Sequence, residues 1–137
     1  LTDFRNKICS LLDPEPRVQQ CDVLCRRSAC EQALFYRWNA DPNPLHLDPR
    51  VAEEAGFERP ILHGLCTFGF AAHALLAVMC DYDATLFGAM DARFTAFVYP
   101  GETLRTEIWN DGSFRTRVLE RDKIAIGNGL FKRRARA

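Results

Sequence analysis

Net charge, long hydrophobic runs and paired cysteines are what this sequence lacks. Lys plus Arg and Asp plus Glu each number 18 among 137 residues, so the formal net charge is zero. This balance argues against a nucleic-acid-binding protein that relies on bulk positive charge. Charged residues or histidines interrupt every apolar stretch before it reaches the roughly 20 residues of a membrane-spanning helix, so no membrane segment is expected.

The six cysteines include no C-x-x-C pair. We therefore expect reduced thiols rather than a disulfide framework, and no metal site, because the ligand spacing of zinc sites is missing. A secretory signal is not expected either, since residues 1–20 carry charges and two prolines and have no continuous apolar core. These features are typical of a protein kept in a reducing compartment.

Two short helices are expected in the first half of the chain. Ser28 and Glu31 have the spacing of a capping box and predict a helix that ends before Pro42. The Asp-Pro pair at 48–49 predicts the start of a second helix, which stops at Gly56.

Residues 64–80 predict a buried helix, because they are apolar on nearly all sides and hold one histidine and no other ionisable group except thiols. The last third of the chain alternates apolar and polar residues around an Asn-Asp-Gly turn, which predicts a meander of three or four antiparallel strands. A buried helix followed by such a meander indicates an α+β fold in which the sheet wraps around the helix. We expect residues 28–137 to form this single domain, after a lead-in segment over residues 1–27.

A loop stiffened by three prolines carries the first candidate chemistry. Asp41 and His46 form a plausible proton-transfer pair, because a neighbouring carboxylate can move the histidine pKa across neutral pH. Asn43, between them, offers an amide donor and a carbonyl acceptor, which suits it to orient a water or a substrate carbonyl. Taken alone, the same residues also fit a loop in which Asp41 forms a turn and Asn43 bonds to the backbone.

Gly64 is the second candidate, because it opens the apolar helix. Unpaired backbone N–H groups and the positive end of the helix dipole stabilise a developing oxyanion at such a position. A glycine also lets a substrate carbonyl approach the backbone closely, although a simple bend into the helix is the plainer alternative. His63 and His73 are expected to be hydrogen-bonded turn and core residues.

Five segments together closely resemble a known family. They are YRWNADPNPLHLDP at residues 36–49, AGF at 55–57, PILHGLCTFG at 60–69, ARF at 92–94 and VYPGETL at 98–104. This pattern resembles the hydratase 2 motif of MaoC-like (R)-specific enoyl-CoA hydratases. Within that family the likeness is strongest to the hydratase unit of peroxisomal multifunctional enzymes, and it covers about residues 30–130.

The resemblance implies a hot-dog fold, in which an antiparallel sheet wraps a central helix. It also implies reversible addition of water to a trans-2-enoyl-CoA to give a (3R)-3-hydroxyacyl-CoA. Carried over by position, Asp41 and His46 would hold the reacting water and move its protons. Asn43 would orient that water, and the Gly64 amide would polarise the thioester carbonyl. No metal and no redox cofactor is implied, since CoA is part of the substrate.

The resemblance also implies partners and a location. Arg93 is expected to contact the CoA phosphates. The chain corresponds to one hot-dog repeat, whereas eukaryotic relatives carry two, so we expect a homodimer or pairing with a second repeat. The family suggests a peroxisomal location, but the final Ala-Arg-Ala differs from the Ser-Lys-Leu type of peroxisomal signal, so a cytoplasmic location stays open. Asn39-Ala40 replaces the Ser-Gly common before the catalytic Asp, and the added methyl group is expected to tighten the loop or to shift Asp41 slightly, which would lower activity.

Other activities are weighed on the same residues. A thioesterase is disfavoured, because it usually needs a carboxylate on the helix and residues 64–80 contain none. A dehydratase acting on carrier-bound 3-hydroxyacyl groups would run the same chemistry backwards and stays open. A non-catalytic acyl-thioester-binding repeat is expected to lack the Asp41–His46 pair.

Overall fold

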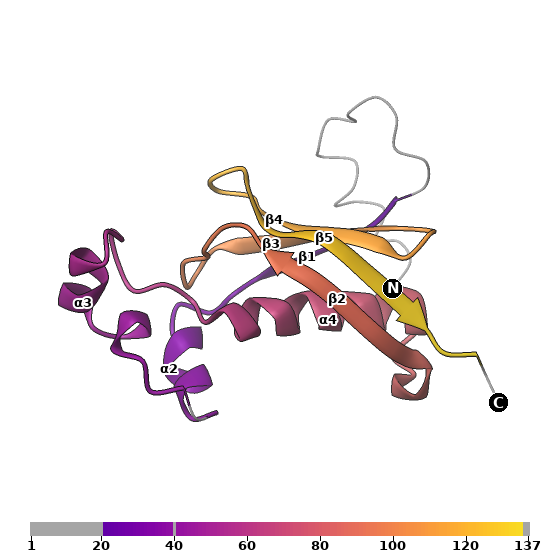
Figure 1. The fold of residues 1–137 in the computed structure, drawn as a ribbon, viewed down its shortest axis with the longest axis horizontal. Helices are drawn as coiled ribbons and strands as arrows, with labels where there is room; N and C mark the ends of the chain where they lie inside the picture. Colours follow the sequence, from indigo (N-terminus) through magenta and orange to yellow (C-terminus); the bar gives the residue numbers. More distant parts are fainter. Residues whose placement is uncertain (1–20, 40, 136–137) are drawn as a thin grey trace.

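The computed structural model describes residues 21–39 and 41–135, which form one antiparallel sheet packed against one long helix (Figure 1). The helices are α2 (Gln32–Arg37), α3 (Pro49–Glu54) and α4 (Gly64–Cys80), with short 3-10 turns η1 (Pro44–His46) and η2 (Ala84–Leu86). The strands are β1 (Cys21–Arg27), β2 (Phe87–Phe94), β3 (Thr103–Trp109), β4 (Ser113–Val118) and β5 (Lys123–Arg133). Within this part of the chain, no helix has the length and apolar content needed to cross a membrane.

The sheet has the strand order β1-β3-β4-β5-β2, with every neighbouring pair antiparallel. The predicted meander is confirmed for β3, β4 and β5. Strand β2 does not extend it, because β2 pairs with β5 and not with β3. The chain leaves β2 at Phe94 and passes the start of α4, where the Leu62 N–H donates to the Val98 carbonyl over 2.7 Å. This crossing brings residues 95–102 to the first turn of the helix.

Strand β1 belongs to the sheet although it lies upstream of the expected domain boundary. Residues 21–27, which the sequence analysis places in a lead-in segment, pair along their whole length with β3. The domain therefore begins before residue 28. The rest of the expected lead-in segment, residues 1–20, lies outside the described residues.

The prediction of a capping box at Ser28 is wrong. The Ser28 hydroxyl donates to the Glu102 carbonyl and accepts from the Gly101 N–H, each over 3.0 Å, so it is engaged by a distant loop. Helix α2 begins later, with Glu31 as its N-cap and no side-chain capping bond. By contrast, Asp48 caps α3 as predicted, because its carboxylate accepts from the Arg50 N–H.

Helix α4 spans the predicted residues 64–80 and lies along one face of the sheet (Figure 1). Ala71 and Leu75 are fully buried and belong to a core cluster that also contains Phe114 and Ile126 of the sheet. The expectation that protein surrounds this helix on all sides holds only in part, since Leu65 in the first turn is 66% exposed. The sheet covers one side of the helix, so the first turn stays open in the single chain.

Candidate active site

A pocket of about 250 Å³ opens at the N-terminal end of α4. It brings together His46 and Gly64, two of the predicted site residues, which lie on different segments of the chain. Thr67 adds a hydroxyl group, and the remaining lining is apolar: Ile61, Leu62, Phe94, Ala96, Phe97 and Val98. A hollow with a few convergent polar groups on an otherwise apolar wall is the usual form of a small-molecule site.

His46 lies in turn η1, and its ring is held in a defined orientation. Its Nδ1 lies 2.8 Å from the carbonyl oxygen of Ile61. Because a carbonyl only accepts, Nδ1 carries the proton and donates it. In the neutral ring Nε2 is therefore unprotonated, and the half-buried side chain presents a basic nitrogen at the pocket.

Asp41 lies beside this ring, as the sequence predicts. One oxygen of its carboxylate, one nitrogen of His46 and one of His63 all lie within 4.8 Å of one another. The Asp41 Oδ1 also accepts from the Asn43 N–H over 3.3 Å, which fixes the start of the loop. A carboxylate and a basic imidazole nitrogen at this spacing can hold one water molecule between them.

Asn43 is placed differently from the sequence prediction. Its side-chain oxygen accepts from the Leu45 N–H over 3.0 Å and caps turn η1. The carbonyl acceptor that we assigned to orienting a water is thus engaged with the backbone. This oxygen has a second lone pair, so it and the amide NH2 group of the exposed side chain can both still contact a water.

Gly64 is the first residue of α4 and is exposed at the pocket. The N–H groups of the first helical turn have no acceptor within the helix, and the helix dipole adds positive potential there. A Cβ atom built on Gly64 would lie 3.6 Å from the ring of Phe94, so the glycine faces the apolar wall at close range. The first residue of α4 and His46 thus line the same pocket.

Arg93 is not brought to this pocket. It is exposed on β2, opposite Gly127 of β5. Its neighbour Phe94 lines the pocket, and successive side chains of a strand point to opposite faces of the sheet. Contact between Arg93 and CoA phosphates remains a prediction that this placement does not favour.

His63 is a site residue that the sequence analysis underrated. It is only 1% exposed, and its ring stacks on that of His46 with the centroids 3.8 Å apart. Its position directly before Gly64 was the available signal, because it adjoins the amide proposed as the oxyanion donor.

The Asp41, His46 and His63 side chains are also the types that bind zinc. The two imidazole rings, however, are inclined by only 28° and lie 3.8 Å apart. A zinc ion lies in the plane of each imidazole that binds it, roughly 2.1 Å from the nitrogen. The planes of two such nearly parallel rings meet only well beyond that distance, so one ion cannot be bound by both. The cluster fits proton transfer better than chelation.

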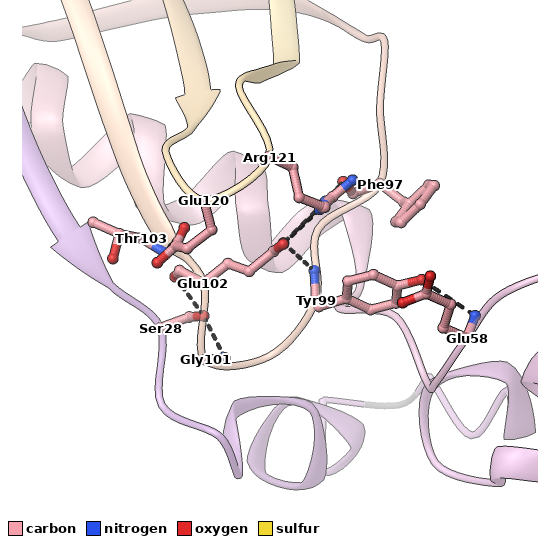
Figure 2. A network of polar contacts seen from close by, with 9 residues as sticks. All are labelled: Ser28, Glu58, Phe97, Tyr99, Gly101, Glu102, Thr103, Glu120 and Arg121. Atoms are coloured by element: carbon pink, nitrogen blue, oxygen red, sulfur yellow. Dashed lines mark hydrogen bonds and ion pairs between the residues drawn. The ribbon is translucent and has the colours of Figure 1, made fainter.

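A partly buried ion pair between Glu102 and Arg121 holds the loop that contains Phe97 and Tyr99 (Figure 2). The Glu102 carboxylate is buried and accepts from the Tyr99 N–H over 2.7 Å and from the Arg121 guanidinium over 2.9 Å. Arg121 also donates to the Phe97 carbonyl over 2.6 Å. These bonds fix the backbone that carries Phe97 and Val98 into the pocket.

Comparison with known proteins identifies the family of this chain. The family profile described as the MaoC like domain matches residues 13–129. The chain belongs to the MaoC-like domain family. Its fold is accordingly the hot-dog fold that the resemblance implied, with α4 as the central helix.

Relatives of this MaoC-like domain include hydratases. This chain is 49% identical over 109 residues to peroxisomal multifunctional enzyme type 2 of Mus musculus. The matched region covers 77% of this chain and 15% of that protein. The chain is 46% identical over 114 residues to the peroxisomal enoyl-CoA hydratase 2 of Arabidopsis thaliana, covering 81% of this chain and 37% of that protein. The solved full-length peroxisomal multifunctional enzyme type 2 from Drosophila melanogaster superposes with a TM-score of 0.81 at 42% identity, covering 90% of this chain and 24% of that one. The chain thus spans well under half the length of these proteins.

Proposed function

We propose that this MaoC-like domain adds water reversibly to a trans-2-enoyl-CoA to give the (3R)-3-hydroxyacyl-CoA. The observation that carries the proposal is the convergence of the basic Nε2 of His46 and the exposed amide of Gly64 on one pocket, with the Asp41 carboxylate beside the ring. The name of the Arabidopsis thaliana relative, enoyl-CoA hydratase 2, supports the same chemistry.

The reaction follows from what each group can do. The thioester oxygen accepts from the Gly64 N–H, which draws electron density from the C2–C3 double bond. His46 removes a proton from a water held between its Nε2 and Asp41, and the water oxygen bonds to C3. The electron pair released at C2 is then protonated by the same His46–Asp41 pair. The net result is addition of H and OH from one side, with no electron transferred and no cofactor consumed.

The experiment is loss of the enoyl-thioester absorbance when the chain is mixed with crotonyl-CoA or a longer trans-2-enoyl-CoA, followed by chiral analysis of the product. Asp41→Asn removes the carboxylate and is expected to lower kcat by about 100-fold or more. Asp48→Asn is the matched control, because an asparagine still caps α3. Absence of turnover by the folded chain on both substrates would contradict the proposal.

We further propose that the chain pairs with a second hot-dog unit, as a homodimer. Large apolar side chains are exposed near the open end of α4, including Phe35, Trp38, which is 90% exposed, and Leu65. Strands β1 and β2 are unpaired on their outer sides within the described sheet, and such edges favour association. Light scattering is expected to give twice the 15.6 kDa chain mass. A monomer at micromolar concentration would instead favour a different hot-dog repeat as the partner.

We also propose a peroxisomal location, since the Mus musculus and Arabidopsis thaliana relatives both carry the word peroxisomal in their names. Microscopy of a fluorescent fusion beside a peroxisomal marker tests this. A diffuse cytoplasmic signal from the full natural protein would overturn it.

A further inference from the structure

His63 is linked to all three residues that the proposed hydration uses. Its ring stacks on His46, at 3.8 Å between centroids. Its Nε2 lies 3.4 Å from the backbone oxygen of Asp41. Its own carbonyl group is joined by a peptide bond to the nitrogen of Gly64. On another side of the ring lies Tyr36, with the ring centroids 4.8 Å apart.

The hydrogen bonding of His63 defines its protonation state. Because the Asp41 carbonyl only accepts, Nε2 carries the ring proton, and in the neutral ring Nδ1 is then unprotonated. That Nδ1 is buried and has no hydrogen-bond partner among the described residues. Burial, and next the proximity of His46, lower the pKa of His63, whereas Asp41 opposes this shift. The ring is therefore neutral at pH 7.

A neutral His63 ring is compatible with a positive charge on the neighbouring His46. When His46 takes a proton from water it becomes positively charged, and a charged ring stacked on it would repel that charge. His63 does not line the pocket and is almost completely buried, so it does not contact the substrate. Its contacts can act only through the residues it holds.

We propose that His63 is a positioning residue, which supports one face of the His46 ring and holds the Asp41 backbone so that both groups keep their spacing at the Gly64 amide. This inference rests on the hydratase function proposed above. Loss of a contact of this kind changes the geometry of the reacting groups without changing the substrate-binding wall.

Three substitutions separate the two contacts. His63→Phe keeps a ring to stack on His46 but removes the donor to Asp41. His63→Gln keeps an N–H group near the position of Nε2 but removes the ring, and His63→Ala removes both. We expect kcat to fall about tenfold in His63→Phe and in His63→Gln, and about 100-fold in His63→Ala, with KM within about twofold of wild type.

His73→Phe is the matched control. His73, like His63, has a buried Nδ1 without a hydrogen-bond partner among the described residues, but it lies inside α4, ten positions and roughly 15 Å along the helix axis from the N-cap His63. We expect its kcat to equal that of the wild type. Urea unfolding of each variant gives the folded fraction by which the rates are corrected.

A second measurement does not depend on turnover. The chain has three histidines, so the imidazole 15N signals are readily assigned. We expect His46 to be a single Nδ1–H tautomer in the wild type and in His73→Phe, and a mixture of tautomers in His63→Ala. Wild-type kcat in all three His63 variants, or an unchanged His46 tautomer in His63→Ala, would overturn the positioning role. A wild-type chain without hydratase activity would refute the proposed function alone, and the tautomer measurement would still decide the role of His63.

Discussion

The Nδ1–H group of His46 donates to the backbone oxygen of Ile61 over 2.8 Å, and Ile61 lies three positions before Gly64. One short segment, residues 61–64, thus orients the basic ring, supports it through His63 and begins the helix whose first amide faces the pocket. A bond from a side chain to this backbone couples the position of the base to that of the amide donor.

His46→Asn separates the orientation of this side chain from its basicity. The asparagine amide lies near the place of Nδ1 and keeps a donor for Ile61, but it has no basic nitrogen at the pocket. We expect kcat to fall by about 100-fold or more, within the range for loss of a general base. Chemical denaturation is expected to show a free energy of unfolding within about 1 kcal/mol of wild type. Activity above a tenth of wild type would contradict the assignment of His46.

Gly64→Ala tests the close approach of substrate to the helix end. The new methyl group would meet the Phe94 ring at 3.6 Å, an ordinary contact, so the fold is kept. It would also occupy space beside the amide, and we expect kcat/KM to fall at least about tenfold. Gly69→Ala on the same helix is the control, because a Cβ there has no neighbour within 4 Å. That variant should keep wild-type kcat/KM, and equal activity of the two variants would contradict the role of Gly64.

Glu102→Gln tests the ion pair behind the pocket wall. The change leaves the Arg121 guanidinium without its buried carboxylate, so we expect a loss of about 2–3 kcal/mol in the free energy of unfolding. The expected loss is smaller than the loss for a fully buried ion pair, because the Arg121 side chain is 24% exposed. Arg117→Gln is the comparison, since its partner Asp122 is 81% exposed, and its loss should stay below about 1 kcal/mol. Equal losses in the free energy of unfolding for Glu102→Gln and Arg117→Gln, measured by urea titration, would refute the idea that burial makes the Glu102–Arg121 pair the more important one.

Stability should decline in mildly acidic solution because of two histidines. Burial lowers the pKa of His63 and of His73 in the folded state. As the pH falls below about 6.5, the unfolded chain binds the proton before the folded chain does, so the free energy of unfolding decreases. Their contribution is therefore complete above the unfolded-state pKa of about 6.5 and is lost as the pH falls below it toward the lowered folded-state values. Urea titrations of wild type, His63→Phe and His73→Phe should show a shallower decline in each variant, and an identical slope would contradict this origin.

Local signals in the sequence predicted much of this molecule. The apolar run and its opening glycine gave the limits of α4, and the Asp-Pro pair gave the start of α3, because capping and turn chemistry act between near neighbours. The proline-stiffened loop placed Asp41 and His46 within reach of each other for the same reason. Resemblance to a family then supplied the chemistry that these residues suggested.

Other features depend on segments far apart in the chain. Ser28 looked like a helix cap, yet its hydroxyl bonds to the loop around Gly101 because the sheet carries β1 past that loop. Strand β2 pairs with β5 rather than β3. The residues next to Ser28 and the residues of β2 contain no local sequence pattern that predicts either contact.

The sequence by itself determined the helix that organises the core, the strands of the meander and the loop that carries the candidate acid–base pair. Only the tertiary structure decided that His63 stacks on His46, that Asn43 uses its carbonyl as a cap and that Arg93 lies away from the pocket. The physical reason is that periodicity and turn preference act over a few residues, whereas ring stacking and strand pairing depend on the packing of the whole domain.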